Sequence, residues 1–468
     1  MKISFWGAAQ QVTGSMHMLT LDNGYKILVD CGLNYEQKRE LNETAFSFPF
    51  NATDIDVVIL THAHIDHSGN LPALVKDGFN GHIFCTPATA DLTKFLLYDS
   101  ANIQWEKYKT LLGRSGKNNR KKVAKPIYTE KQVSQALDKI ITLPFNRKFE
   151  LNESVSFELI EAGHLLGAAS VVINVKKGND VKRFGFTGDL GRHNAEIIRT
   201  PVAMKDLNYL ITESTYGGRK HRTSADAETD LLGYIEDTCV RMRGRLIIPA
   251  FSVGRTQAIV HTLNRLEKKG KLPDVKVFVD SPLAVRSTHV YSNHPELLNS
   301  DANKFINQYG SLFEFENLHW IEDIEGHDEL MGYTDPCIIV SAAGMVEGGR
   351  IQEHVSNNIQ NPFSTILIAG YCTEGTLGHK LLQGMKQISI KGKEYTIYAK
   401  IAATDVFSSH PDKDELMDYI TACNNPALKK IFLVHGDFEN LEKLKETIEL
   451  SGITADVEIP DEKDEYRI

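Results

Sequence analysis

The sequence predicts an α/β protein of more than one domain. Its 468 residues exceed the size at which a single hydrophobic core usually stops growing. Short apolar strands alternate with helical segments, most regularly after residue 207, and this alternation indicates a mainly parallel sheet. Several strands also end in an acid or a histidine, and the carboxyl ends of strands are where α/β sheets bind ligands.

Composition argues against several classes of protein. The formal net charge of -9 gives no overall sign of nucleic-acid binding, so such binding needs a local basic lining. No apolar run approaches the roughly 20 residues that cross a bilayer. The strand-like start Met1–Gly7 is unlike a signal peptide, so we expect a cytoplasmic protein without a membrane partner. The six cysteines form no Cys-x-x-Cys pair, which argues against a disulfide scaffold and a thiolate zinc site.

The segment Thr61–His67 carries the strongest local signal. It contains four side chains that bind metals well: His62, His64, Asp66 and His67. The apolar run Val57–Leu60 before it predicts a buried strand. If the chain continues extended, His62, His64 and Asp66 point to one side, and a turn at 68–70 before a helix brings His67 to the same cavity.

Imidazole nitrogen and carboxylate oxygen together suit zinc, manganese or iron. The segment therefore predicts a site for two metal ions. The alternative is a polar loop in which the histidines only cap the helix expected from Leu71.

Five further predicted strands end in a polar group. They are Ile27–Val29 before Asp30, Phe157–Ile160 before His164, Phe184–Phe186 before Asp189, Tyr209–Ile211 before Glu213, and Ile431–Val434 before His435. These side chains can converge at one edge of the fold. For any one of them alone, a turn or a helix cap is a serious alternative.

The order of elements suggests an insertion. A long helix is expected within 88–112. From 207 onwards strands and helices alternate in a βαβ pattern. The expected helices are 225–241 and 256–269, and the expected strands are 245–249 and 275–279. Near 395 the chain changes character and later supplies His410, His435 and a helix at 441–450. If His435 joins the site of His62, residues 207–394 are inserted between 1–206 and 395–468 of one domain.

Longer motifs resemble a known family. Thr61–His67 resembles the HxHxDH signature of the metallo-β-lactamase fold, and the segments around Asp30, His164 and Asp189 resemble its other motifs. Motifs A, B and C of the β-CASP nucleases resemble Glu213–Gly217, Phe407–Asp412 and Leu433–Asp437, and Pro249–Gln257 and Ala369–Leu377 are also typical of that group. One departure is Pro411, where many relatives have threonine.

The resemblance covers nearly the whole chain. It implies an αββα metallo-β-lactamase sandwich with an inserted, mainly parallel α/β β-CASP domain. The most similar families are bacterial and archaeal RNA-processing nucleases and the nuclease subunit of the eukaryotic cleavage and polyadenylation factor.

The resemblance also implies roles for individual residues. His62, His64 and His164 hold one zinc ion; Asp66, His67 and His435 hold a second; Asp189 bridges the two. Asp66, Glu213 and His410 are the implied catalytic residues, with His410 giving a proton to the departing 3′ oxygen and Glu213 holding it. Asp30 orients a metal-binding histidine, or is only a turn residue before Gly32.

Two ions about 3.5 to 4 Å apart share a hydroxide near neutral pH and stabilise charge on a phosphoryl oxygen. We therefore expect a zinc-dependent ribonuclease, an endonuclease or a 5′-exonuclease, that acts on single-stranded RNA in processing or decay. Manganese is the alternative metal, and the resemblance is compatible with a homodimer or an RNA-processing complex. His435 resembles the RNA-directed branch, because DNA-directed members usually carry an apolar residue there.

Three alternatives remain open at this point. They are a hydrolase of small esters or thioesters, a DNA-directed β-CASP nuclease, and an inactive scaffold subunit. Phosphate contacts are expected from Ser252 and Arg255, which precede a helix. A glycine-rich segment that contains Gly344, Gly349 and Arg350 is the second candidate. Each can instead be a helix cap. The basic run at 114–125 is either an RNA guide or a solvated loop.

Overall fold

The computed structural model describes residues 1–34, 46–114, 123–221 and 226–468, which form two compact units. Unit 1 comprises Met1–His193, Thr200–Lys220 and His410–Ile468, and unit 2 comprises Asn194–Arg199 and His221–Ser409. No helix in the described ranges has both the length and the apolar character needed to span a membrane.

Unit 1 contains two seven-stranded sheets. The first has the order β22-β1-β2-β3-β4-β5-β6, and the second has the order β21-β20-β11-β10-β9-β8-β7. The strands of the first sheet are β1 (Lys2–Gly7), β2 (Met16–Thr20), β3 (Lys26–Val29), β4 (Val57–Ile59), β5 (His82–Cys85), β6 (Ile140–Thr142) and β22 (Glu465–Arg467). Those of the second are β7 (Phe149–Asn152), β8 (Val155–Glu161), β9 (Ala169–Lys177), β10 (Asp180–Phe186), β11 (Tyr209–Glu213), β20 (Lys430–Val434) and β21 (Asp456–Glu458).

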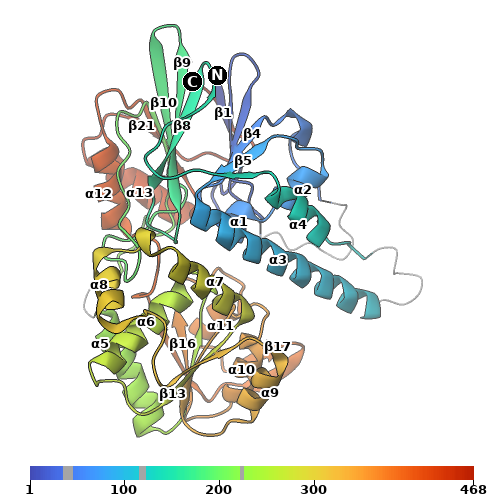
Figure 1. Cartoon of the computed structure of the whole chain (residues 1–468), viewed down its shortest axis with the longest axis vertical. Helices are drawn as coiled ribbons and strands as arrows, with labels where there is room; N and C mark the ends of the chain where they lie inside the picture. The colour runs from blue at the N-terminus through green and yellow to red at the C-terminus, as the bar shows by residue number, and fades with distance from the viewer. Residues whose placement is uncertain (35–45, 115–122, 222–225) are drawn as a thin grey trace. The chain divides into compact units, whose positions relative to one another are not determined.

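The two sheets share one apolar core, and helices cover their outer faces (Figure 1). The helices are α1 (Ile65–Ser68), α2 (Leu71–Lys76), α3 (Pro87–Arg114), α4 (Glu130–Leu137), α12 (Lys413–Cys423) and α13 (Phe438–Leu450). In β3, Ile27 and Val29 face the inner core while Leu28 faces the outer core below α2. The continuous apolar runs of the sequence arise because these strands are buried on both faces.

Unit 2 is built on a parallel sheet of six strands in the order β14-β13-β15-β12-β16-β19. The strands are β12 (Arg245–Pro249), β13 (Lys276–Asp280), β14 (Leu318–Ile321), β15 (Cys337–Ser341), β16 (Thr365–Ala369) and β19 (Lys400–Thr404). The helices are α5 (Ala227–Ile235), α6 (Arg255–Lys268), α7 (Pro282–Asn293), α8 (Ser300–Tyr309), α9 (Ile324–Gly332), α10 (Ile351–Asn358) and α11 (Leu377–Leu382), with a hairpin of β17 (Gln387–Ile390) and β18 (Lys393–Thr396). The predicted fold class, an αββα sandwich and a mainly parallel α/β domain, is therefore confirmed.

The units divide the chain at other places than the sequence suggested. Strand β11, expected to open the inserted block at 207, pairs with β10 and β20 in unit 1. Strand β19, expected beyond 394 in the final segment, pairs with β16 in unit 2. The main divisions therefore fall after Lys220 and after Ser409, and the short segment Asn194–Arg199 also belongs to unit 2. The helix expected at 225–241 is α5 followed by a π-helical stretch, Glu236–Arg241, and residue 225 lies outside the described ranges.

Candidate metal centre and active site

The segment Thr61–His67 leaves its strand earlier than expected. Strand β4 ends at Ile59, and α1 begins at Ile65 with His64 as its N-cap residue. The backbone amides of His67 and Ser68 both donate to the carbonyl of His64, at 2.9 and 2.8 Å. The expectation that Asp66 alternates along an extended chain is therefore wrong, because a helical turn presents it instead.

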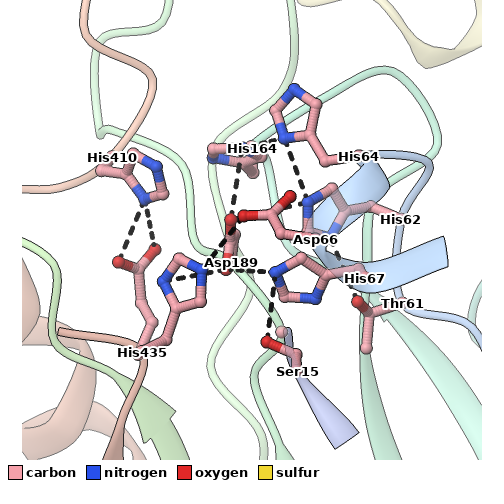
Figure 2. A network of polar contacts seen from close by, with 12 residues as sticks. Ser15, Thr61, His62, His64, Asp66, His67, His164, Asp189, His410 and His435 are labelled. Atoms are coloured by element: carbon pink, nitrogen blue, oxygen red, sulfur yellow. Dashed lines mark hydrogen bonds and ion pairs between the residues drawn. The ribbon is translucent and has the colours of Figure 1, made fainter. Parts of the chain in front are cut away.

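The structure brings the candidate ligands of unit 1 together in two sets. The first set is His62, His64, His164 and Asp189, and the second is Asp66, His67 and His435; within each set the ligand atoms lie within 4.8 Å of one another. Asp189 lies between the sets, as Figure 2 shows. Its Oδ2 is 3.5 Å from Nε2 of His62, and its Oδ1 is 3.1 Å from Nε2 of His67.

The spacing of these atoms fits divalent ions. Nδ1 of His64 is 3.2 Å from Nε2 of His62 and 3.2 Å from Nε2 of His164. Two nitrogens bound to one tetrahedral ion at about 2.0–2.1 Å would stand about 3.3 Å apart. Nε2 of His435 is buried and has no hydrogen-bond partner among the described residues. A buried polar atom needs a partner, and an ion would supply it.

Burial keeps the first set of imidazoles neutral. Loss of solvent lowers the pKa of His62 and of His164 well below the usual value, and lowers the pKa of His64 to about 4. Neighbouring rings, His67 for His62 and His410 for His164, lower these pKa values further. A histidine must be deprotonated to bind a metal, so this set is ready for coordination near neutral pH.

The carboxylates of the site remain ionised. Burial alone would raise the pKa of Asp189, but the charges of His435, His67 and His62 outweigh it and hold that pKa well below its usual value. Burial lowers the pKa of His67, whereas Asp189 and Asp30 raise it, and the net result is a pKa well above the usual value. Acids are thus placed against histidines in this cluster.

Asp30 contacts one member of the second set, His67, and the neighbouring Thr61. Its Oδ2 accepts hydrogen bonds from Nδ1 of His67 at 2.7 Å and from Oγ1 of Thr61 at 2.8 Å, and its Oδ1 accepts from the amide of Thr61 at 2.7 Å. Asp30 also has a left-handed backbone, with φ at 62°. Its geometry therefore combines the contact to a histidine with the turn that the sequence offered as the alternative.

Glu213 and His410 meet beside the first set. Nδ1 of His410 is 3.1 Å from each carboxylate oxygen of Glu213. Burial lowers the pKa of His410, but the charge of Glu213 and its hydrogen bond outweigh burial and raise that pKa above the usual value. The rings of His410 and His164 are 4.5 Å apart between centroids. A protonated imidazole can thus stand next to the candidate ligands.

Sequence reasoning missed Thr215. Its Oγ1 lies 3.1 Å from Nδ1 of His435 and donates to the backbone carbonyl of His435 at 3.2 Å. If Oγ1 also accepts a hydrogen bond from Nδ1, the ring of His435 carries its proton on Nδ1 and its lone pair on Nε2. This Nε2 lies 3.6 Å from Oδ2 of Asp66. Thr215 stands two positions after Glu213 within motif A, but no local pattern links it to His435, which lies 220 positions further along the chain.

The phosphate candidates lie in unit 2 and differ among themselves. Arg255 begins α6 and stacks over the ring of Phe251 at 4.7 Å. A Cβ atom on Gly344 would lie 3.3 Å from Nη1 of Arg255, so these two candidates are neighbours. Oγ of Ser252 is 3.3 Å from Oγ of Ser281, which caps α7.

Arg350 does not have the surroundings expected of a phosphate contact. Its guanidinium donates to Oδ1 of Asp280 at 2.7 Å and to the carbonyls of Glu322 and Asp323 at 3.1 and 2.9 Å. The fully buried carboxylate of Asp280 needs a cation, and Arg350 supplies it. Gly349 is exposed, with φ at 69°. From the basic run, Lys117, Arg120, Lys121 and Lys122 lie outside the described residues.

Comparisons with known proteins agree with this fold. The model of the metallo-beta-lactamase superfamily matches residues 11–278, that of the Beta-Casp domain matches 256–381, and that of the Zn-dependent metallo-hydrolase RNA specificity domain matches 394–460. The chain is 29% identical over 452 residues to ribonuclease TTHA0252 of Thermus thermophilus, covering 97% of both proteins. It is 30% identical over 448 residues to the transcription termination factor FttA of Methanosarcina mazei, covering 93% of this chain and 67% of that protein.

The fold, the histidine and aspartate cluster and these matches define a metal-dependent hydrolase of the metallo-β-lactamase fold. The chain belongs to the β-CASP group of the metallo-β-lactamase superfamily.

Proposed function

We propose that this protein is a zinc-dependent ribonuclease that hydrolyses phosphodiester bonds of single-stranded RNA. The observation that carries the proposal is the placing of two ligand sets around Asp189, directly beside the Glu213 and His410 pair. A relative named as a ribonuclease, similar along 97% of its length, supports the choice of RNA. So does the match of residues 394–460 to an RNA specificity domain.

Each ligand set would hold one ion. His62, His64 and His164 would hold the first, Asp66, His67 and His435 the second, and Asp189 would contact both. Zinc suits nitrogen and oxygen donors, and manganese is the alternative. When bound, the two ions would make water a nucleophile near neutral pH and neutralise charge on the phosphoryl group. Asp30 would fix the ring of His67 by accepting a hydrogen bond from its Nδ1.

His410 would supply the proton of the reaction. Cleavage of the P–O3′ bond leaves an alkoxide, which is a poor leaving group unless it is protonated. Glu213 holds Nδ1 of His410 and favours the charged ring, so Nε2 is the nitrogen that can give its proton to the 3′ oxygen. After the transfer, Glu213 would keep the neutral ring in place for reprotonation.

In unit 2, Ser252, Arg255, Gly344 and Gly349 remain the proposed contacts for RNA phosphates. The six parallel strands of that unit support this assignment, because the four residues follow the carboxyl ends of β12 and β15. Arg350 is better explained as the partner of Asp280.

The test uses metal-loaded protein and single-stranded RNA labelled at one end, with either a 5′ monophosphate or a 5′ triphosphate. We expect cleavage of both RNAs if the enzyme is an endonuclease, and release of mononucleotides if it is a 5′-exonuclease. DNA of the same sequence and a small thioester serve as competing substrates. Absence of RNA cleavage by protein that carries its full complement of metal would contradict the proposal. Faster turnover of DNA or thioester would replace it.

A further inference from the structure

Unit 2 contains a second cluster of buried acids and histidines. Asp280, at the end of β13, lies with His327 and His354, and all three side chains are buried. The ligand atoms are close enough together to raise the question of another metal site. Nothing in the proposed chemistry of unit 1 uses these residues.

Distances distinguish this cluster from the metal centre. Oδ2 of Asp280 is 2.6 Å from Nδ1 of His327 and 2.6 Å from Nε2 of His354. These are lengths of charge-assisted hydrogen bonds, shorter than the roughly 3.3 Å between two ligands of one zinc ion. The other oxygen of Asp280 accepts from Arg350 at 2.7 Å, and a fixed guanidinium opposes a cation at the same carboxylate. Asp280 is therefore the acceptor of a hydrogen-bonded network.

The network fastens both ends of one loop. Strand β15 ends at Ser341, whose Oγ donates to the carbonyl of Asp280 at 2.7 Å. Nine residues later, Arg350 donates to the side chain of the same Asp280. Between them the loop folds back, and the amide of Ile351 donates to the carbonyl of Ala342 at 3.2 Å. A Cβ atom on Gly349 would lie 2.5 Å from that carbonyl oxygen, so this close return requires glycine.

The loop Ser341–Arg350 also holds its neighbours. Oε1 of Glu347 accepts from the amide of Leu377 at 2.6 Å, at the start of α11. The carbonyl of Met345 accepts from the amide of Gly378 at 2.9 Å. Gly344 packs against the guanidinium of Arg255, as described above. The loop thus joins the beginnings of α6 and α11, while Gly348 and Gly349 are exposed.

We propose that Asp280 is a positioning residue for RNA, which holds the Ser341–Arg350 loop, through Ser341 and Arg350, in the shape that receives phosphate groups. This inference rests on the proposed ribonuclease function. A loop that must present backbone amides to a phosphate gains affinity when its shape is fixed in advance. Asp280 provides this fixation from the buried side, without touching RNA.

Two variants distinguish loss of the contacts that hold the loop from a general loss of stability. Arg350→Lys keeps the positive charge but removes the planar fork that reaches Asp280 and two carbonyls together. Asp280→Asn keeps the shape but turns one acceptor oxygen into a donor among groups that donate. The matched control is Arg286→Lys in the same unit, because Arg286 is exposed and pairs with Glu322 at the surface, at 2.9 Å.

The experiment measures KM and kcat for a single-stranded RNA oligonucleotide, together with metal content and amide hydrogen exchange of residues 342–349. For Arg350→Lys and Asp280→Asn we expect KM to rise about tenfold with kcat within about twofold, as for lost preorganised binding. Exchange of the loop amides should become faster, metal content should stay at the wild-type value, and Arg286→Lys should match the wild type.

Unchanged loop exchange in both variants would overturn the inference, whether or not the protein cleaves RNA. Faster exchange with an unchanged KM would also overturn it, because the loop would then be held for stability alone. If wild-type protein cleaves no RNA, the proposed function fails by itself. In that case direct binding of the same oligonucleotide decides, and equal affinity of wild type and Arg350→Lys would overturn the inference. A third ion bound per chain and lost in Asp280→Asn would replace the network with a metal site.

Discussion

Both carboxylate oxygens of Glu213 lie 3.1 Å from Nδ1 of His410, although the two residues are 197 positions apart in the chain. The same carboxylate accepts the backbone amide of Leu190 at 2.6 Å, and the amide of Glu213 donates to Oγ1 of Thr187 at 3.0 Å. Glu213 is therefore fixed on two sides before it meets the imidazole. His410 is the less buried of the two partners.

Replacement of His410 tests the proton donor. We expect His410→Ala to lower kcat by about 10²- to 10⁴-fold, the usual contribution of general acid catalysis. Its metal content should equal that of the wild type, because the ring is outside both ligand sets. His193→Ala, an exposed histidine of the same unit, is the control. Normal turnover in His410→Ala would remove this residue from the mechanism.

The two ligand sets predict a graded loss of metal. Wild-type protein should contain two ions per chain, measured by elemental analysis after extensive dialysis. His435→Ala should retain one ion, because the set of His62, His64 and His164 is intact. Asp189→Ala should retain less than His435→Ala, since its carboxylate faces both sets. Equal metal content in wild type and His435→Ala would show that His435 is not needed to hold the second ion.

Thr215 should control metal affinity through His435. Thr215→Val preserves the shape of the side chain but removes the hydroxyl next to Nδ1. Loss of such an outer contact typically weakens metal binding by about 10- to 100-fold. We therefore expect metal affinity to fall by the same factor in a chelator competition assay, and to recover in Thr215→Ser. Thr238→Val, at a buried threonine pair of unit 2, should bind metal as the wild type does. Failure of Thr215→Ser to recover would contradict a role for the hydroxyl.

Acid should destabilise unit 2 through His261. Burial, with a smaller effect of Arg265, lowers the pKa of His261 to about 4. The unfolded chain, with a pKa near 6.5, then binds more protons than the folded chain between pH 6.5 and pH 4. Stability contributed by the neutral ring is present above pH 6.5 and is lost as the pH falls through this window.

At pH 5 the lowered pKa of His261 should reduce the free energy of unfolding by about 2 kcal/mol. Urea unfolding at pH 7 and pH 5 measures it, because His261→Gln should reduce the difference between the two pH values by that amount. His289→Gln changes an exposed histidine of the same unit and serves as the control. An equal pH difference in wild type and His261→Gln would refute the assignment.

Sequence alone predicted which side chains gather and at which sheet edges, because both depend on local patterns. Val57 to Ile59 formed the buried strand expected, and His435 came to the site of His62 across the whole inserted unit. The helical turn that carries Asp66 was missed, since four residues are too few to show a helical period. Thr215 and the engagement of Arg350 by Asp280 were missed because side-chain partners distant in sequence leave no local signal.

The order of the ligands along the chain has a consequence for synthesis. His62, His64 and His164 emerge from the ribosome first, whereas His410 follows unit 2 and His435 follows β20. On the proposed roles, a nascent chain that ends within unit 2 can bind an ion but has neither the proton donor nor the complete second ion site. The ability to cut RNA would therefore arise only late in translation, which would spare the messenger from which the enzyme is being made.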